Sequence, residues 1–387
     1  MVKIKSKLFT FKDKLGSIEF RIRKSGVVEL GKKRVPTVKN TPKQQQHRLV
    51  YSCCNRLYKH VSNELLTKLL KKYRHFNLDS YRVWMKHCMG NLKPQHCVKI
   101  TVHNPNDYDL IDFPILVELN SKAIIGELCN NNPNTILFYD DMFSNTLSYW
   151  VETWDTTNYI ARIWVKIPQI KAKSDTNLFM LINNNWNIKI SDPYSIFIFF
   201  DHFEGDKLDT NKWVYRGYWF KVSNSVLTMY GDWSYRNYYI NSKTKFKSPL
   251  IIVGKWRIGK INKDTDLSVA LRDRIDGSIF ESGYDCIYDG QHTYSWGQKR
   301  ISYLWGILAC GGKVTDTNWQ YFMIKVTDSK IEFWDSLLGN LTVSKGISEF
   351  HLGLAVDADS DSFGEIDWVG VMQYASYLPQ IIKIKIV

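Results

Sequence analysis

Two carboxylates stand two residues apart near the C-terminal end of the sequence, at Glu365 and Asp367. Retaining glycoside hydrolysis needs a nucleophile and an acid/base about 5–5.5 Å apart, and alternate residues of one strand supply that separation. No third carboxylate follows three residues further on, where the sequence has Gly370. We therefore expect no catalytic residues here and predict that the chain is not an enzyme.

Three aspartates that alternate with small residues are candidate ligands for calcium: Asp357, Asp359 and Asp361. Calcium prefers several hard oxygen ligands, and a calcium-binding helix-loop-helix also needs glycine at the sixth loop position and glutamate at the twelfth. Ser362 takes the sixth position and no glutamate takes the twelfth. We expect no cofactor and leave a structural calcium ion open.

Two His-Cys pairs, His87-Cys88 and His96-Cys97, carry side chains that can bind zinc. Zinc sites usually separate paired ligands by two to four residues so that both point inward, and adjacent residues do not do this. The seven cysteines are irregularly spaced in a chain long enough to fold without covalent links. We expect mostly free thiols and no zinc site.

Aromatic side chains in turn-rich, polar segments are candidates for sugar binding, because exposed flat rings beside polar groups suit saccharides. The alternative is that these rings fill a core or a subunit contact, as most aromatic side chains do. The candidate carbohydrate-binding residues are Tyr218, Trp219, Trp233, Tyr235, Tyr238, Trp296 and Trp305.

Charge is divided by position along the chain. Residues 1–100 contain 24 of the 52 Lys and Arg but only 5 of the 38 Asp and Glu. Such a cationic segment binds an acidic neighbouring subunit or, less readily, nucleic acid, and the other interpretation is a solvated face. The basic anchoring patch comprises Lys32, Lys33, Arg34, Lys39, Lys43, Arg48, Lys71, Lys72 and Arg74.

The basic segment has the pattern of a β-hairpin followed by helices. Apolar residues alternate around two glycines before residue 31, which predicts the hairpin. Thr41 and Gln44 flank Pro42 as in a capping box, so a helix should begin at Pro42. Apolar stripes at three- and four-residue spacing predict a second helix through Leu65 and a third after Asp79.

This segment resembles a small N-terminal module of phage and prophage virion proteins. The resemblance rests on residues 14–21, 32–36 and 40–44, together with Arg48 and Trp84. It implies that residues 1–96 form a module that anchors the chain to other virion subunits.

Residues 97–195 predict a β-sandwich, because short strands separated by Asn, Asp and Pro turns replace the helical periodicity. The order of its segments resembles an uncharacterised β-sandwich domain family of archaeal and bacterial surface proteins. That family usually precedes a concanavalin-like domain, and the resemblance implies no chemistry. The matching segments are residues 110–117, 137–140, 147–154 and 163–168.

Residues 196–380 resemble a concanavalin A-like jelly roll, the fold of lectins and β-glucanases. The resemblance rests on residues 199–213, which match its entry, and on residues 363–371, which match its returning last strand. The Glu-x-Asp pair is also similar to part of the β-glucanase signature. In the tail, residues 381–387, Ile alternates with Lys, which predicts one extra strand of the kind that completes a neighbour's sheet edge.

The sequence thus predicts a mainly β protein, a β-sandwich followed by a jelly roll, with a small basic hairpin and helical module. We expect no signal peptide and no membrane span. The leading hypothesis is a non-enzymatic virion structural protein, such as a spike, fibre or decoration, assembled in the host cytoplasm and displayed on the extracellular particle surface. Its partners would be virion subunits, further copies of itself and host glycans. The alternatives are a cell-surface or secreted carbohydrate-binding protein and a divergent glycoside hydrolase.

Overall fold

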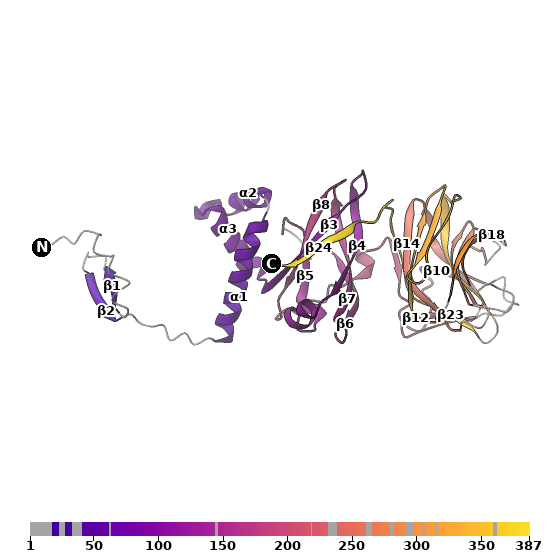
Figure 1. Ribbon diagram of the computed structural model, residues 1–387, viewed down its shortest axis with the longest axis horizontal. Coiled ribbons are helices and arrows are strands. Elements are labelled where there is room, and N and C mark those ends of the chain that lie inside the picture. Colours follow the sequence, from indigo (N-terminus) through magenta and orange to yellow (C-terminus); the bar gives the residue numbers. More distant parts are fainter. Residues whose placement is uncertain are drawn as a thin grey trace. The chain divides into compact units, whose positions relative to one another are not determined.

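The computed structural model (Figure 1) describes residues 18–22, 28–32 and 41–387, except for residues 62, 144–145, 218, 231–237, 261–264, 279–281, 291–297, 305, 315 and 359–361. It divides into two units, residues 1–49 and residues 50–387, and each is described by itself.

The first unit contains the predicted hairpin and the start of the first helix. Strands β1 (Ile18–Ile22) and β2 (Val28–Lys32) pair antiparallel. Helix α1 (Pro42–Leu57) begins at the predicted residue. The backbone N–H of Gln44 donates to Thr41 Oγ1 at 3.3 Å, and the N–H of Thr41 donates to Gln44 Oε1 at 3.2 Å. This reciprocal pair satisfies two donors that a helix start leaves unpaired, and it confirms the prediction of a capping box.

The helical layer of the second unit is short and covers a β-sheet. Helix α3 follows Asp79, as the sequence predicted, and Asp79 caps it by accepting a hydrogen bond from the N–H of Arg82 at 2.8 Å. Among the described helices, none has the length and apolar character needed to cross a membrane. Besides α1, the helices and helical turns are η2 (Tyr58–His60), α2 (Asn63–Lys72), η3 (Arg74–Phe76), α3 (Ser80–His87), η4 (Cys88–Leu92), η5 (Ala123–Leu128), η6 (Pro133–Thr135) and η7 (Pro193–Ser195).

A disulfide joins α1 to the turn after α3, between Cys54 and Cys88. Beside it the buried Trp84 donates its indole N–H to the carbonyl oxygen of Cys54 at 2.7 Å. The other five cysteines are free, which confirms the prediction of mostly free thiols, with this one disulfide as the exception. Of the His-Cys pairs, Cys88 is used in the disulfide, and His87 Nδ1 lies 2.9 Å from the Asn91 side-chain amide.

The β-sandwich consists of two antiparallel sheets. The outer sandwich sheet has the order β24-β3-β8-β5, and its far face packs against the helices. The inner sandwich sheet has the order β4-β7-β6. The strands are β3 (His96–His103), β4 (Leu110–Asn120), β5 (Ile136–Tyr139), β6 (Tyr149–Asp155), β7 (Ile160–Ile170), β8 (Asp175–Ile182) and β24 (Gln380–Ile386).

The jelly roll also consists of two packed sheets. The inner jelly-roll sheet has the order β11-β12-β23-β14-β19-β20-β21, and β9 pairs with β23. Its strands are β9 (Phe199–Asp201), β11 (Phe220–Ser223), β12 (Val226–Tyr230), β14 (Leu250–Ile258), β19 (Gln320–Val326), β20 (Ile331–Asp335), β21 (Gly339–Val343) and β23 (Phe363–Gln373).

The outer jelly-roll sheet has the order β10-β13-β22-β15-β16-β17-β18. Its strands are β10 (Trp213–Arg216), β13 (Tyr239–Lys247), β15 (Thr265–Arg272), β16 (Tyr284–Gly290), β17 (Gln298–Tyr303), β18 (Gly306–Lys313) and β22 (Glu349–Ala358). The predicted fold class, mainly β with a sandwich followed by a jelly roll, is confirmed.

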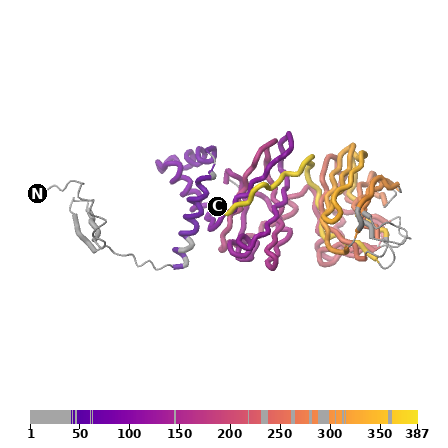
Figure 2. The backbone as a smooth tube through the Cα atoms, viewed as in Figure 1, coloured from indigo at the N-terminus to yellow at the C-terminus, as the bar shows by residue number. Residues whose placement is uncertain are grey.

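The C-terminal tail returns to the sandwich. Strand β24 pairs with β3, with Ile384 opposite Ile100 and Ile386 opposite Val98. Figure 2 shows this strand in yellow along the earlier, purple sandwich. The prediction of a strand was correct, but the strand completes a sheet of its own chain, because alternation specifies a strand without specifying its partner.

The sheets are stacked, and the two inner sheets face each other. One apolar cluster fills the jelly roll between its two sheets. A second cluster fills the sandwich and continues to Val253, Trp368 and Met372 of the inner jelly-roll sheet. The two β domains, which lie side by side in Figure 1, are therefore joined by a shared apolar cluster.

Candidate functional site

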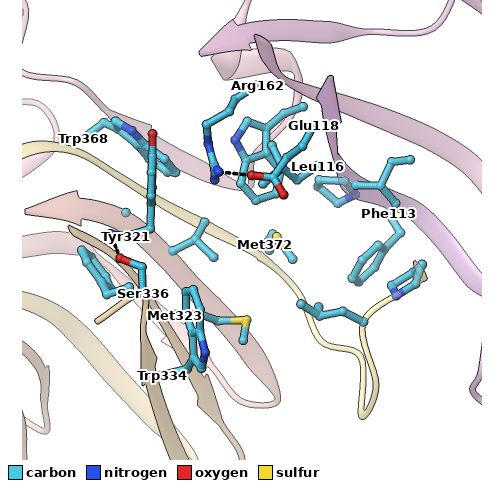
Figure 3. Close-up of a pocket in the computed structure, with 18 residues that line it drawn as sticks. Phe113, Leu116, Glu118, Arg162, Tyr321, Met323, Trp334, Ser336, Trp368 and Met372 are labelled. Carbon is cyan, nitrogen blue, oxygen red and sulfur yellow. Dashed lines mark hydrogen bonds and ion pairs between the residues drawn. The ribbon is translucent and has the colours of Figure 1, made fainter. Parts of the chain in front are cut away.

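A hollow of about 560 Å³ lies at the interface of the inner sandwich sheet and the inner jelly-roll sheet (Figure 3). Strands β4 and β7 form one side, and β14, β19, β20 and β23 form the other. The lining residues are Phe113, Pro114, Ile115, Leu116, Glu118, Arg162, Trp164, Val253, Gly254, Tyr321, Phe322, Met323, Trp334, Ser336, Trp368, Met372, Leu378 and Pro379.

Strand alternation places these side chains on the facing surfaces. In β20, Ile331 and Phe333 are buried in the jelly-roll core. Because successive side chains of a strand point to opposite faces, Trp334 points away from that core. In the sandwich, Glu118 pairs in register with Arg162, while the residue before it, Val117, is buried in the core. The hollow is therefore lined by side chains that alternate, along their strands, with the residues of the two cores.

An ionic network forms one wall of the hollow. Arg162 donates to Glu118 and, through Nε, to Glu152 Oε1 at 3.3 Å. The indole N–H of Trp164 donates to Glu152 Oε2 at 2.8 Å. The Arg162 guanidinium lies 3.8 Å from the ring centre of Tyr321, so this cation ties the sandwich to the jelly roll.

Burial changes the proton affinity of two groups in this network. Burial raises the pKa of the Glu152 carboxyl, although Arg162 and Tyr321 favour its charged form. Burial and the neighbouring Glu152 charge raise the pKa of the Tyr321 hydroxyl. In contrast, the Glu118 side chain is 62% exposed. Glu118 is therefore the carboxylate of the network that a ligand can reach.

Aromatic rings form the rest of the wall. Trp334 is 37% exposed, whereas Trp164 and Trp368 are buried. Figure 3 shows Trp334 and Met323 on the side opposite Glu118 and Arg162. An accessible indole thus faces an accessible carboxylate across an apolar hollow.

The two described residues among the predicted carbohydrate-binding set, Trp219 and Tyr238, do not line the hollow. Trp219 is buried in the jelly-roll core and donates its indole N–H to the Arg216 carbonyl oxygen at 3.2 Å. Tyr238 stacks on Trp219 with ring centres 6.5 Å apart. For Trp219 the prediction of an exposed platform was wrong, because its ring fills the core. Predicted residues that lie outside the described part of the chain are Tyr218, Trp233, Tyr235, Trp296 and Trp305.

Among the described residues of the other predicted sites, none lines the hollow. The described basic side chains Lys43, Arg48, Lys71, Lys72 and Arg74 are exposed in the helical region. Lys33, Arg34, Lys39 and the side chain of Lys32 lie outside the described residues, as do Asp359 and Asp361. Asp357 is half-buried on β22. Within the described ranges, no three His, Cys, Asp or Glu side chains are grouped as a metal site.

The Glu-x-Asp pair lies on β23, outside the hollow. Glu365 and Asp367 are on one face of the strand, as the spacing predicted. Glu365 accepts hydrogen bonds from Arg257 at 2.5 Å and from Thr228 at 3.1 Å, and Asp367 accepts from Lys255 at 2.7 Å. A side chain at Gly370 would begin 2.9 Å from the ring of Phe197. Close packing against the sandwich thus explains why no third carboxylate stands there.

Comparisons with known proteins concern the two β domains. A family model described as Domain of unknown function (DUF2341) matches residues 132–216, the end of the sandwich and the beginning of the jelly roll. No curated protein matches the chain in sequence.

Solved structures are similar to part of this chain. A putative β-glucanase from Mycobacterium abscessus is 16% identical, and the match covers 45% of this chain and 99% of that chain with a TM-score of 0.34. A β-1,3-glucanase from Mycobacterium marinum is 15% identical, covering 47% and 99% with a TM-score of 0.34. A glycosyl hydrolase family protein from Mycobacterium fortuitum is 13% identical, covering 45% and 99% with a TM-score of 0.34. At these identities the likeness describes the fold.

These matches contradict the prediction that the chain is not an enzyme, because all three structures carry the names of glucanases or glycosyl hydrolases. That prediction rested on the missing third carboxylate and is withdrawn.

Proposed function

We propose that this chain binds a saccharide in the hollow between its two inner sheets. The observation that carries the proposal is the pairing of the accessible Trp334 with the accessible Glu118 across an apolar hollow. An indole covers the apolar C–H face of a sugar ring, while a carboxylate accepts hydrogen bonds from its hydroxyl groups. The volume of about 560 Å³ lies in the range of small-ligand sites, roughly 300–1,000 Å³.

Protein contacts already hold the polar wall in place. Arg162 is fixed by two carboxylates and by the ring of Tyr321, so Glu118 is oriented before a ligand arrives. Preorganisation of this kind lowers the entropic cost of binding. A neutral saccharide fits this wall best, because Arg162 is already paired with Glu118 and Glu152 and does not offer a free cation to an anionic group.

A glycan array probed with the full chain tests this proposal, followed by titration of the retained glycans. Trp334→Ala should weaken binding about tenfold, the loss expected for one aromatic contact. Glu118→Gln should also weaken it. The matched control is Tyr230→Ala, which removes a similarly exposed ring on β12, outside the hollow. Retention of no glycan, or equal binding by Trp334→Ala and the chain itself, would refute the proposal.

A second candidate is glycoside hydrolysis at Glu365 and Asp367. The observation that favours it is that the two carboxylates lie two residues apart on one face of β23. Each would have to exchange its Arg257 or Lys255 partner for substrate, since both are ion-paired in the structure.

Release of reducing sugar from β-1,3-glucan tests this second candidate. Glu365→Gln and Asp367→Asn should each lower the rate by roughly 100-fold or more if the residues act in acid–base catalysis. Glu349→Gln is the control, because Glu349 is an exposed, ion-paired carboxylate of the other sheet. If all variants released reducing sugar at the same rate, Glu365 and Asp367 would be excluded as catalytic residues.

Attachment through the basic N-terminal segment is the remaining part of the proposal. It is supported by exposed Lys71, Lys72 and Arg74 beside the helical core. Assignment to a virion, with virion subunits as partners and display outside the particle, stays a prediction. Cryo-electron microscopy of assemblies that carry the chain tests it, since residues 1–96 should then contact neighbouring subunits.

A further inference from the structure

The outer sandwich sheet ends in a strand that is incompletely covered. β24 is the terminal strand in the order β24-β3-β8-β5, so in the described residues its second edge has no partner strand. Edge strands present a row of backbone N–H and C=O groups that can pair with another chain.

Packing confirms that this edge is open. Ile384 is 36% exposed and Ile386 is 46% exposed, although their register partners on β3, Ile100 and Val98, are both fully buried. The same sheet face is therefore covered at β3 and uncovered at β24. The inner sandwich sheet, which would supply the cover, ends at β4.

A second hollow adjoins this edge. It has a volume of about 630 Å³ and is lined by Leu116 and Glu118 of β4 together with Gln380–Ile384 of β24. A strand added to β24 would place every second side chain toward this hollow. Binding by strand addition uses this combination, in which backbone pairing gives affinity and a neighbouring pocket gives specificity.

Charge selects the kind of strand that fits. Lys383 and Lys385 alternate with the isoleucines and are both exposed. Opposite charges directly across two strands are favourable and like charges are unfavourable. A second β24 would bring lysines against lysines, so a second copy of this chain is disfavoured as the occupant.

We propose that the free edge of β24 binds an extended segment of an acidic partner protein, in which apolar residues alternate with Asp or Glu. The apolar residues would cover Ile384 and Ile386 and enter the hollow, while the carboxylates would pair with Lys383 and Lys385. This proposal does not rest on the saccharide proposal and does not need Trp334, although the two hollows share Leu116 and Glu118.

Fluorescence anisotropy of labelled heptapeptides with the full chain tests the proposal. The probes alternate Val with Glu, alternate Val with Lys, or carry Pro at the centre of the Val-Glu peptide. The Val-Glu peptide should bind in preference to the Val-Lys peptide, and the Pro peptide should bind more weakly because it lacks one backbone donor.

Charge reversal provides the decisive variant. Lys383→Glu with Lys385→Glu should weaken binding of the Val-Glu peptide about tenfold and create binding of the Val-Lys peptide. The matched control is Lys243→Glu with Lys247→Glu, which makes the same charge change on exposed residues of β13 and should have no effect. Equal binding of the two peptides, or equal loss in the control, would overturn the proposal. Sedimentation equilibrium would also overturn the proposal if the wild-type chain self-associates and only the variant with Lys383→Glu and Lys385→Glu is monomeric.

Discussion

The inner jelly-roll sheet is packed differently on its two faces. Toward the outer jelly-roll sheet, Trp256, Phe322 and Phe333 are at most 2% exposed, and the ring centres of Trp256 and Phe322 are 4.6 Å apart. Toward the sandwich, Trp334 is partly exposed and a hollow of about 560 Å³ remains. The same strands thus form a filled core on one side and an incompletely filled interface on the other.

This difference indicates where stability and binding are located. Filled cores lose free energy when a side chain is shortened, because a cavity remains. A hollow that is already open to solvent loses little when one wall residue is shortened. Substitutions on the two faces should therefore separate folding from ligand binding, and the following predictions test that separation.

The largest effect is expected for Trp256→Ala, on the filled face. Trp256 is fully buried between Phe322 and Phe333. Its loss should lower the free energy of unfolding by about 3–5 kcal/mol. Urea unfolding followed by circular dichroism measures this change. A decrease below about 1 kcal/mol would mean that this face is not a close-packed core.

A comparable effect is expected when the ion pair inside this core is broken. Lys299 and Asp335 are at most 1% exposed, and Lys299 Nζ lies 2.8 Å from Asp335 Oδ2. Lys299→Met leaves Asp335 buried without its cation and should cost about 3–5 kcal/mol.

Adding Asp335→Asn to Lys299→Met should recover part of this loss in the same urea experiment, because the unmatched charge is then gone. Lys245→Met serves as the surface control, since its pair with Glu349 is about half exposed and should leave the unfolding midpoint unchanged. Equal midpoints for the Lys299 and Lys245 variants would contradict the assignment of the pair to the core.

A smaller, pH-dependent effect is expected at the hollow. Burial raises the folded-state pKa of Glu152 above its ordinary value of 4.5. The folded chain then binds the proton more tightly than the unfolded chain, so this group contributes most below about pH 4.5 and its contribution is lost as the pH rises through the folded pKa. Relative to Glu152→Gln, the wild-type chain should become less stable from pH 4 to pH 7. Thermal unfolding of both proteins measures this difference in stability. If the wild-type chain became more stable than Glu152→Gln over that range, the folded-state pKa of Glu152 would have to be lowered and not raised.

The smallest effect on stability is expected for Trp334→Ala. The side chain is partly exposed on the open face, so the free energy of unfolding should change by no more than about 0.5 kcal/mol. The saccharide affinity should fall in the same protein. A large loss of stability would place Trp334 among the core residues and weaken the separation of the two faces.

Much of the fold could be predicted from local sequence patterns. The helix start at Pro42 and the cap at Asp79 follow from side-chain hydrogen bonds within three residues. The place of β24 did not follow, because its partner β3 lies more than 270 residues earlier. A disulfide between Cys54 and Cys88 was missed for the same reason, since 34 residues separate the two thiols.

The site was harder to predict than the fold. The residues predicted to bind a saccharide were aromatic residues in turns. The rings of the hollow lie in strands, where the sequence pattern does not distinguish them from core residues. The sequence contained one signal. Ile331 and Phe333 stand at alternate positions of a strand, so Trp334 points to the opposite face from these two core residues. That it faces Glu118 depends on the stacking of two domains, which no local pattern encodes.

A crystal structure of the full chain with the best-retained oligosaccharide tests the central claim most directly. The saccharide should lie in the hollow, with one ring on Trp334 and a hydroxyl group hydrogen-bonded to Glu118. A saccharide bound on the outer jelly-roll sheet, or at Glu365 and Asp367, would contradict the claim that the interface of the two β domains is the binding site.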